Sequence, residues 1–235
     1  MNSPEHFASD LKISVIIPTL NEAALLPATL TQVKQHRPFE IIIGDGGSED
    51  DTTEIARRHQ VPVVTSARGR AAQMNAAARE ARGDLLLFLH ADSQIGPRAY
   101  QKMLSTMSRG EHVGGAFSLE IHSPKPSLKT ISRLATLRSR YLNLVYGDQG
   151  IFVRPDVFRE MSGFSSLPIC EDLDFFRRLR KRGPVVVLRE KMRTSARRWL
   201  AEGIAFTTAR NIAIALLFLM GFSPDRLSRW YQPKR

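Results

Sequence analysis

The sequence has little cysteine, no long apolar run and few acidic residues relative to basic ones. Cys170 is the single cysteine among 235 residues, which excludes an intramolecular disulfide and a cysteine-based zinc or iron–sulfur site. The longest apolar run, Ile212 to Met220, has nine residues, well short of the ~20 that a membrane-spanning helix needs. The segment from Met1 to Lys12 is polar and contains two acids, unlike a secretory signal. These features predict a cytoplasmic, reducing compartment.

The composition is that of a globular protein whose charge is concentrated in one half. Hydrophobic residues at 43% and charged residues at 24% exclude wholesale disorder and collagen-like structure. Residues 1–120 contain 12 basic and 14 acidic side chains, whereas residues 121–235 contain 22 and 9. An excess of this size predicts an anionic partner, such as nucleic acid, a phosphorylated substrate or a membrane surface, or else a basic solubilising surface.

The first half alternates strand-like and helix-like segments. Four apolar runs of strand length occur, at 12–17, 39–43, 61–64 and 84–89. Helical stretches are expected between them, over 22–35, over a helix capped by Ser48, and over 70–82. Continuous apolar strands separated by helices indicate a parallel sheet covered on both faces. The fold class is therefore α/β, with a Rossmann-like, mostly parallel sheet.

The second half no longer shows the regular alternation of strands and helices. Strands are predicted over 113–121 and 185–188, and helices over 128–145, 172–182 and 201–222. The helix over 128–145 is basic, and the helix over 201–222 is apolar and ends near Gly221 and Pro224. No internal repeat or linker stands out, so residues 1–235 are predicted to form one domain with a helical C-terminal extension.

Three acidic positions at strand or helix ends are the strongest candidates for chemistry, because ligands gather at the carboxyl ends of parallel strands. Asp45 precedes two glycines and could bond a ribose hydroxyl or a base. Asp92 follows a hydrophobic strand, where a divalent cation bridging its carboxylate to a diphosphate would offset the cost of burial. Asp172, with Glu171 before it and Asp174 close by, could serve as general base toward an acceptor hydroxyl.

Each of these positions also has a purely structural interpretation. Asp45 could stabilise a turn, Asp92 could cap a helix that starts near Pro97, and Glu171 and Asp172 could favour a helix N-terminus. The occurrence of all three in order, on one expected face, favours the functional interpretation.

The same positions fall in a recognisable pattern. Val15-Ile16-Ile17-Pro18-Thr19-Leu20-Asn21-Glu22, Asp45-Gly46-Gly47-Ser48, His90-Ala91-Asp92-Ser93, the segment 147–164 and Glu171-Asp172-Leu173-Asp174 resemble the family-2 inverting glycosyltransferases of the GT-A fold. The resemblance spans roughly residues 12–190. Gly69 to Asn75 and Ser195 to Trp199 are similar to a small bacterial subgroup without transmembrane spans.

The resemblance implies a role for each matching residue. Residues 12–120 would bind the nucleotide-sugar donor and residues 121–235 the acceptor. The nucleotide-binding residues would be Pro18, Thr19, Asn21, Glu22, Asp45 on the base, Arg68 or Arg70 toward the phosphates, and Ala91. Asp92 would hold Mg²⁺ or Mn²⁺, Asp172 would be the catalytic base, and Glu171 would stand beside it in the catalytic pair.

Two departures from the family pattern bear on mechanism. His90 stands where the usual Asp-x-Asp motif has its first aspartate, and imidazole is a poor Mg²⁺ ligand; His90 would then either contact the metal or face the core. Ser195-Ala196-Arg197-Arg198-Trp199 lacks the glutamine of the processive synthases' Gln-x-x-Arg-Trp signature, which argues against a polymerising synthase. Trp199 would either stack on an acceptor or belong to the core.

Two other functions compete with sugar transfer. A sugar-phosphate nucleotidyltransferase shares the architecture but usually carries a glycine-rich loop and a basic residue after the first strand, and neither is present. A basic nucleic-acid-binding module would explain the charge, but the sequence has four tyrosines and no binding motif, so no nucleic-acid partner is expected.

The acceptor is unidentified, and the basic second half suggests a lipid- or phosphate-linked one. We hypothesise that the basic and apolar helices form a peripheral membrane-facing surface, with the arginines gathering anionic headgroups. Those arginines are Arg133, Arg138, Arg140, Arg193, Arg197 and Arg198. The alternative is that the apolar helix packs against the sheet or against a second subunit in a homodimer.

Overall fold

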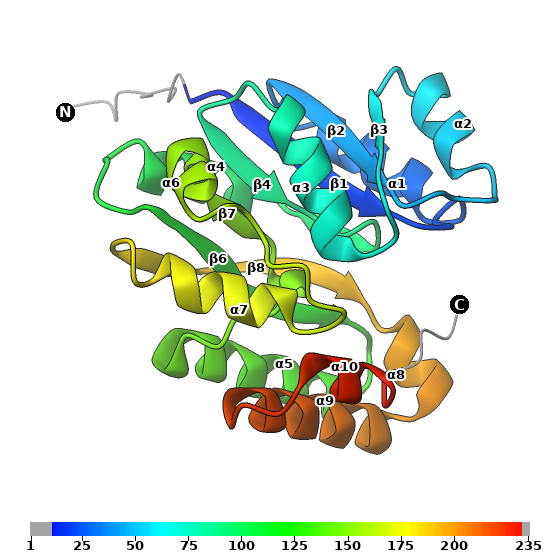
Figure 1. Cartoon of the computed structure of the whole chain (residues 1–235), viewed down its shortest axis with the longest axis vertical. Coiled ribbons are helices and arrows are strands. Elements are labelled where there is room, and N and C mark those ends of the chain that lie inside the picture. The colour runs from blue at the N-terminus through cyan, green and yellow to red at the C-terminus, as the bar shows by residue number, and fades with distance from the viewer. Residues whose placement is uncertain (1–10, 232–235) are drawn as a thin grey trace.

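An eight-stranded mixed sheet forms the centre of the structure, a computed structural model that describes residues 11–231 (Figure 1). The segment from Met1 to Lys12, which is not expected to be a secretory signal, lies almost entirely outside the described residues. The strands are β1 (Ile13–Thr19), β2 (Glu40–Asp45), β3 (Val63–Thr65), β4 (Leu85–Phe88), β5 (Ser93–Ile95), β6 (Gly114–His122), β7 (Ile151–Val153) and β8 (Val185–Ser195), in the spatial order β3-β2-β1-β4-β7-β6-β8-β5.

The sheet is mostly parallel, as predicted, with antiparallel pairs in its second half. β1 pairs in parallel with β2 and β4, β2 with β3, and β6 with β8. β7 is antiparallel to both of its neighbours, and β5 is antiparallel to β8. In the parallel half, Thr19 lies opposite Asp45 in the β1–β2 register, so the carboxyl ends of β1 and β2 meet at one edge.

The helices cover both faces of the sheet and add a separate layer at the C-terminus. They are α1 (Leu26–Lys34), α2 (Thr52–Arg58), α3 (Arg70–Glu80), α4 (Pro97–Met107), α5 (Pro126–Leu137), the π-helix η1 (Arg138–Leu142), the 3₁₀-helix η2 (Gly147–Gln149), α6 (Pro155–Glu160), α7 (Glu171–Leu179), α8 (Arg197–Glu202), α9 (Ile204–Leu219) and α10 (Pro224–Ser228). Among the described residues, no helix has both the length and the apolar character needed to cross a membrane.

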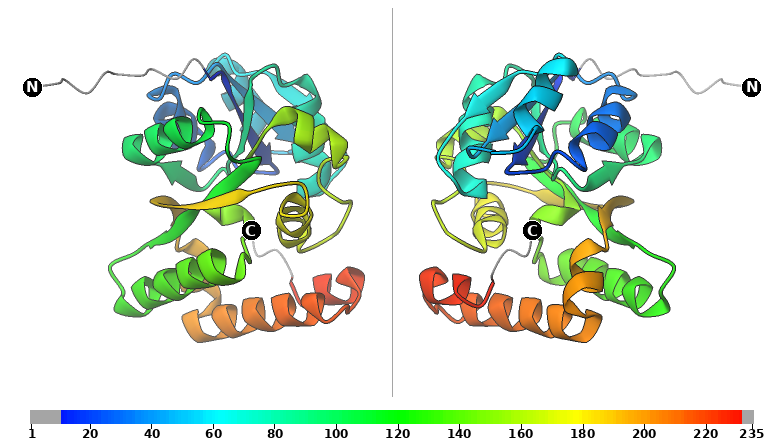
Figure 2. Two further views of the ribbon diagram at one scale, coloured as in Figure 1. Left: turned by 90° about the vertical axis from the view of Figure 1, so that its left-hand side faces the viewer. Right: turned by 90° about the vertical axis from the view of Figure 1, so that its right-hand side faces the viewer.

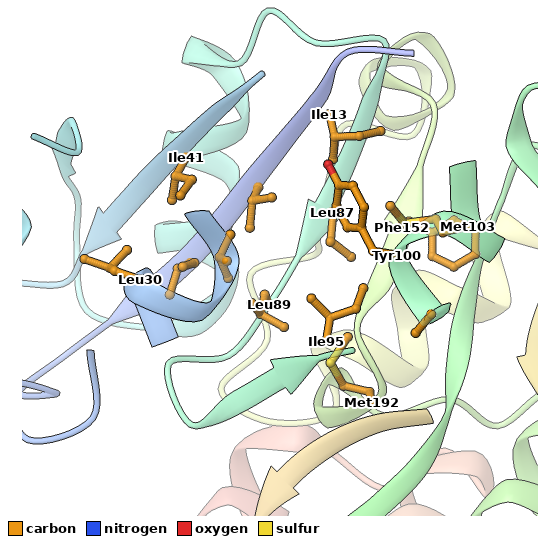
Figure 3. Close-up of a cluster of buried hydrophobic side chains, with 14 of the residues drawn as sticks. Ile13, Leu30, Ile41, Leu87, Leu89, Ile95, Tyr100, Met103, Phe152 and Met192 are labelled. Carbon is orange, nitrogen blue, oxygen red and sulfur yellow. The ribbon is translucent and has the colours of Figure 1, made fainter. Parts of the chain in front are cut away.

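Two buried clusters fix the helices on opposite faces. On one face, side chains of β1, β2 and β4 pack with Leu30 of α1 and with Tyr100 and Met103 of α4 (Figure 3). On the other face, Met74 of α3 packs with side chains of α6 and α7 such as Phe175. The residues of β1 and β4 are all buried, which explains why their sequences are continuously apolar rather than alternating.

A further layer lies below the sheet and consists of α5, α9 and α10. Both side views show α5 and α9 next to each other beneath the end of α7 (Figure 2). α5 packs on β6 through Leu128, and α9 and α10 pack on the start of α7 through Ile214 and Leu227. This layer is the predicted helical C-terminal extension, together with the basic helix that precedes β7.

Several predicted boundaries were wrong, and each has a local cause. The predicted helix over 201–222 is broken at Gly203, whose φ of 94° lies outside the helical region. The predicted helix over 128–145 leaves α-geometry at Arg138 and ends at Asn143, which has a left-handed φ of 54°. The strand predicted over 185–188 continues to Ser195, because β6 and later β5 pair with its second part.

Candidate functional site

Asp45 organises the loop that follows β2. Its carboxylate accepts hydrogen bonds from the hydroxyls of Thr19 (3.0 Å) and Ser48 (2.6 Å) and from the amides of Gly47 (2.9 Å) and Ser48 (2.8 Å). A carboxylate has about four acceptor positions, so these bonds use its capacity. This geometry fits the turn-stabilising interpretation, and a contact with a base stays a prediction. Ser48 is thereby committed to Asp45 and does not cap α2, whose N-cap residue is Asp51.

The loop after β1 is hydrogen-bonded to the loop after β2. Asn21, in a left-handed conformation with φ 55°, donates its amide to the Ser48 hydroxyl (2.9 Å) and accepts the amide of Glu49 (2.8 Å). The amide of Glu22 donates to the Thr52 hydroxyl (2.8 Å). Pro18, like Thr19, is buried at the end of β1. The predicted nucleotide-binding segments of β1 and β2 are therefore joined by several hydrogen bonds.

The predicted phosphate-binding arginines are already paired with carboxylates. Arg68 is exposed, lies 2.9 Å from Glu49, and does not line the cavity described below. Arg70 reaches Glu171, with Nε 2.7 Å from Oε1. Ala91 is buried, and its carbonyl oxygen accepts the hydroxyl of Thr29 on α1 (2.6 Å). Of the two arginines, Arg70 is the one that the structure brings to the acidic positions.

A cavity of about 270 Å³ opens where the end of β4, η2, the start of α7 and the helices α8 and α9 come together. Asp92 and Asp172, which are distant from each other in the sequence, both line this cavity, as do Arg70 and His90. Pro18, Thr19, Asn21, Glu22 and Asp45 do not line it. The structure thus brings the metal-binding and catalytic candidates together in one cavity.

Asp172, at the start of α7, is oriented by two backbone amides, one from η2 and one from α7 itself. The amide of Gly147 donates to Oδ2 (2.6 Å), and the amide of Leu173 donates to Oδ1 (2.7 Å). Glu171, 2% exposed, is held by Arg70 instead; burial raises its pKa and Arg70 opposes that effect. Asp174 is tied to Ser165 (2.7 Å) and Arg178 (2.7 Å) and lies outside the cavity lining. Asp172 is therefore the acidic side chain of this turn with the most direct access to the cavity.

Asp92 has unused acceptor capacity, which fits a metal ligand. Its carboxylate accepts a single long hydrogen bond, from the Ser93 hydroxyl (3.5 Å), and burial raises its pKa while Arg197 opposes that effect. The helix near Pro97 is capped by Gly96 without any side-chain bond, so Asp92 does not cap it. Mg²⁺ in nucleotide sites is commonly held by one or two carboxylates with phosphate oxygens and waters, and one carboxylate is what Asp92 offers.

His90 is a neutral imidazole in the wall of the cavity. Burial lowers its pKa to about 3, with Arg70 and Arg198 lowering it further. In the part of the chain that the structure describes, no three metal-ligating side chains converge. A metal here would accordingly depend on Asp92 and on the ligand's own oxygens.

Asp148 was not predicted as a site residue from the sequence, yet it lines the same cavity as Asp92 and Asp172. Burial raises its pKa to about 6, with Asp172 and Asp92 adding to the rise and Arg138 opposing it. Its signal in the sequence is a carboxylate between glycines, as Asp45 lies between Gly44 and Gly46, although Asp148 precedes a buried strand whereas Asp45 ends one. That pattern in Gly147-Asp148-Gln149-Gly150 could have identified it.

The C-terminal helices close one side of the cavity. Arg197 extends back toward the donor half, with Nη2 3.8 Å from Glu22 Oε2, and burial raises the pKa of Glu22 while Arg197 opposes. Trp199 lines the cavity and also packs against the cluster that contains Leu128, so its stacking on an acceptor stays a prediction. Its indole nitrogen donates to the hydroxyl of Thr208 (3.3 Å).

Sequence comparison places the chain in a known family. Residues 14–167 match the family described as Glycosyl transferase family 2, a match over more than half of the chain. The chain belongs to this family, as the sequence motifs indicated.

Individual relatives resemble parts of the chain. A Haemophilus influenzae protein named "Uncharacterized glycosyltransferase" is 27% identical over 186 residues, covering 71% of this chain and 61% of that protein. The undecaprenyl-phosphate 4-deoxy-4-formamido-L-arabinose transferase of Aeromonas hydrophila is 33% identical over 121 residues, covering 46% and 37% respectively. The chain therefore spans less than two thirds of the length of these curated relatives.

Solved structures show the same fold. S. aureus TarS 1–349 in complex with UDP-GlcNAc superposes with a TM-score of 0.62 at 18% identity, covering 79% of this chain and 58% of that chain. Glucosyl-3-phosphoglycerate synthase from Mycobacterium tuberculosis, in complex with Mn²⁺, UDP and glucosyl-3-phosphoglycerate, gives a TM-score of 0.56 at 19% identity, covering 77% and 71%. The predicted GT-A fold is confirmed.

Proposed function

We propose that the protein transfers a sugar, with inversion, from a nucleoside-diphosphate sugar to a hydroxyl of an acceptor. The observation that carries this proposal is that Asp92 and Asp172 line one cavity at the carboxyl end of β4. The solved relatives support it, since TarS was determined with UDP-GlcNAc and the mycobacterial synthase with UDP and Mn²⁺.

The donor nucleotide would lie over the two hydrogen-bonded loops that follow β1 and β2. Pro18 and Thr19 end β1, Asn21 and Glu22 lie in the loop that follows it, and Ala91 lies in the turn between β4 and β5. Asp45 acts there mainly by holding its loop in shape, because a base that bonds its carboxylate must compete with four existing hydrogen bonds. Arg70, with Arg68 further out, supplies positive charge on the path to the phosphates.

Asp92 would hold Mg²⁺ or Mn²⁺ against the donor diphosphate. When bound, such an ion neutralises the charge that develops on the departing diphosphate. His90, which carries no charge at neutral pH, adds no repulsion toward the cation. Arg197 and Arg198 add positive charge to the cavity near Asp92.

Asp172 would act as the general base. The acceptor oxygen bonds to the anomeric carbon as the bond to the diphosphate breaks, and the acceptor proton passes to a carboxylate oxygen of Asp172. The amides of Gly147 and Leu173 fix that carboxylate, and the Arg70–Glu171 pair supports the turn behind it.

A lipid- or phosphate-linked acceptor fits the basic lining of the cavity. Arginines 70, 197 and 198 line it. Among the relatives, the Aeromonas protein is named for undecaprenyl phosphate, and the mycobacterial synthase was determined with a phosphoglycerate product. Each of these two descriptions names a compound that carries a phosphate group.

A membrane-associated site of action is supported by an unusual exposed surface. Of twelve exposed large hydrophobic side chains among the described residues, eleven lie between Leu134 and Trp230. On α9 the exposed side chains are apolar, with Ile212 at 52% and Leu216 at 54% exposed, and its C-cap residue Met220 is 66% exposed, whereas Arg210 is turned inward onto Glu202. Residues at this spacing share one helix face, so the outward face of α9 is apolar.

The neighbouring helix adds positive charge to this surface. Leu134, Leu137 and Tyr141 are exposed on α5 and η1, as are Arg133 and Arg140, and residues 121–145 contain five basic and no acidic side chains. We call the exposed apolar side chains of α5, η1 and α9 the interfacial face. Apolar side chains flanked by cations suit a bilayer with anionic headgroups.

The structure corrects the membership of this surface. Arg138 stacks on Tyr146 at 3.5 Å, and Arg197 and Arg198 line the cavity, so these three do not belong to the interfacial face. Arg193 is exposed but lies on β8 beside Glu120.

Product analysis tests the transfer itself. Incubation with nucleotide sugars, Mn²⁺ and a bacterial lipid or sugar-phosphate extract should release a nucleoside diphosphate. Release of pyrophosphate would instead indicate a nucleotidyltransferase, and release of neither would leave a binding protein.

A further inference from the structure

Arg198 lines the cavity and, within residues 11–231, has no ion-pair partner. The other two arginines of the lining are paired, Arg70 with Glu171 and Arg197 with Glu22. In residues 11–231, no carboxylate lies within salt-bridge distance of the Arg198 guanidinium, which instead stacks on the ring of Tyr231 at 4.4 Å. Burial lowers the pKa of Arg198, Glu202 and Asp92 oppose that effect, and Arg70 and Arg210 add to it. A cation held in this way is stabilised by an anionic ligand.

Polar atoms around Arg198 also lack partners. Arg198 Nη1, Glu202 Oε1 and Asn211 Oδ1 are buried without a hydrogen bond, and all three residues line the cavity. Buried polar atoms are nearly always bonded in folded proteins, so unsatisfied ones gathered at one place mark where a ligand or ordered water bonds. The set contains a charged donor and two acceptors, which suits a ligand that carries both an anionic group and hydroxyls.

Arg197 and Arg198 reach different neighbours around the cavity. Arg197 and Arg198 are consecutive on α8 and so point in directions about 100° apart. Arg197 extends to Glu22 on the β1 loop, whereas Arg198 extends to Tyr231 beyond α10, near Glu202 and Asn211. The two arginines thus divide the cavity between the donor loops and the C-terminal helices.

We propose that Arg198, Glu202 and Asn211 form an acceptor subsite that binds a phosphate ester, with the phosphate on Arg198 and neighbouring hydroxyls on Glu202 and Asn211. This subsite rests on the proposed sugar transfer, because it assigns the acceptor end of the same cavity. The phosphate ester comes either from a soluble sugar or polyol phosphate or from a lipid headgroup. Both sources present the same oxygens to Arg198.

Calorimetry with simple phosphate esters tests the subsite without knowledge of the natural acceptor. Glycerol 3-phosphate and inorganic phosphate are titrated into the full chain without divalent metal. Glycerol 3-phosphate should bind, and Arg198→Gln should weaken it by about 10- to 100-fold, the loss expected for a hydrogen bond to a charged group. Asn211→Ala should weaken glycerol 3-phosphate more than inorganic phosphate, which has no carbon-bound hydroxyl. Arg193→Gln, which removes an exposed arginine outside the cavity, serves as the matched control and should bind normally.

A second pair of measurements separates this subsite from the donor site. Asp92→Asn should not weaken glycerol 3-phosphate binding, because it removes a negative charge near Arg198 and takes away no partner of the phosphate. Binding that requires Asp92 and Mn²⁺, or that survives Arg198→Gln, would overturn the proposal and assign the anion to the donor diphosphate. Binding of the phosphate esters without any nucleotide-sugar binding would instead overturn the proposed transfer and leave the subsite standing. If Arg198→Gln does not fold, Asn211→Asp provides the test, since a second negative charge beside the phosphate should abolish binding.

The source of the phosphate follows from a third titrant. Short-chain phosphatidic acid, used below its micelle concentration, should bind more tightly than glycerol 3-phosphate if the natural acceptor is a lipid, because its acyl chains reach the apolar wall of Ile214 and Ala215. Equal affinity assigns a soluble acceptor. An absence of binding by every phosphate ester at millimolar concentration overturns the subsite.

Discussion

The backbone amide of Gly147 lies 2.6 Å from Oδ2 of Asp172 and donates a hydrogen bond to it. A Cβ atom on residue 147 would lie 2.7 Å from Nε2 of His90 and 3.4 Å from Oδ2 of Asp172, so any side chain at this position would force the His90 imidazole to shift. The η2 segment thus positions the carboxylate proposed as catalytic base, although it lies 25 residues before it.

The first prediction concerns that carboxylate. Asp172→Asn retains an oxygen for the Gly147 amide but cannot accept the acceptor proton, so turnover should fall by about 10²- to 10⁴-fold. Donor affinity, measured by calorimetry with a nucleotide sugar and Mn²⁺, should change little. Asp156→Asn on the exposed side of α6 is the control. Near-normal turnover of Asp172→Asn would transfer the role of base to Glu171 or Asp174.

The second prediction concerns the metal. Asp92→Asn removes the charge that would hold Mg²⁺ or Mn²⁺, so the metal-dependent part of nucleotide-sugar binding should disappear while the fold is retained. Titrating the nucleotide sugar with and without Mn²⁺ measures that part directly. An unchanged affinity together with an unchanged metal requirement would show that the diphosphate binds elsewhere.

The donor-side strands were predictable because their signal is local. β1, β2 and β4 are central strands buried on both faces, and their continuous apolar runs reveal them in the sequence. β5 and β7 have three residues each, too few to show a periodicity, and they exist because β8 and β4 offer them antiparallel partners. Gly203 breaks a stretch whose flanking residues favour a helix on both sides, so composition alone did not locate the break.

The site was predictable where a motif carried it and not where packing assembled it. Asp92 and Asp172 follow recognisable segments and do meet in the cavity. The partner of Arg70 is Glu171, about a hundred residues away, and no local pattern indicates that pair. Arg198, Glu202 and Asn211 are brought to the cavity by the turn at Gly203, which joins α8 to α9.

The third prediction concerns the stability of the Arg70–Glu171 pair. Arg70→Met leaves the nearly buried Glu171 carboxylate without its partner. The loss in free energy of unfolding should lie between the ~1 kcal/mol of an exposed pair and the ~3–5 kcal/mol of a fully buried one, because the Arg70 side chain is partly exposed. Urea denaturation measures it, and Arg68→Met, which removes an exposed pair with Glu49, should cost no more than ~1 kcal/mol.

The double variant Arg70→Met/Glu171→Leu provides the matching control. Replacing both charges with apolar side chains of similar size removes the unpaired carboxylate, so most of the stability should return. Equal destabilisation by the single and double variants would show that the pair's packing, rather than its charge, matters.

The fourth prediction concerns pH. Because the pKa of Asp148 is raised from 3.8 to about 6, the folded protein binds more protons than the unfolded chain between those values, and the contribution of Asp148 to stability falls as pH rises through that window. Asp148→Asn lacks this effect. Its free energy of unfolding should match the wild type near pH 4 and exceed it by up to ~3 kcal/mol above pH 6. Urea denaturation at a series of pH values gives the difference, and a difference independent of pH would show that the carboxyl is not held in a desolvated state.

The fifth prediction tests the interfacial face. Vesicles of phosphatidylcholine with phosphatidylserine should co-sediment the protein, and added salt should weaken the binding because Debye screening reduces the attraction of the arginines to the headgroups. Leu216→Glu places a charge on the outward face of α9 and should abolish binding, and Arg133→Glu with Arg140→Glu should weaken it. Phe39→Glu is the matched control, since Phe39 is the one exposed large hydrophobic side chain in the described residues outside the C-terminal half.

A two-fold homodimer through the same face would bring the arginines of both copies close together. Their mutual repulsion would oppose the dimer, so a bilayer is the better partner. Absence of binding to any vesicle at low salt, combined with a concentration-dependent dimer that Leu216→Glu dissociates, would assign this face to a second copy of the chain.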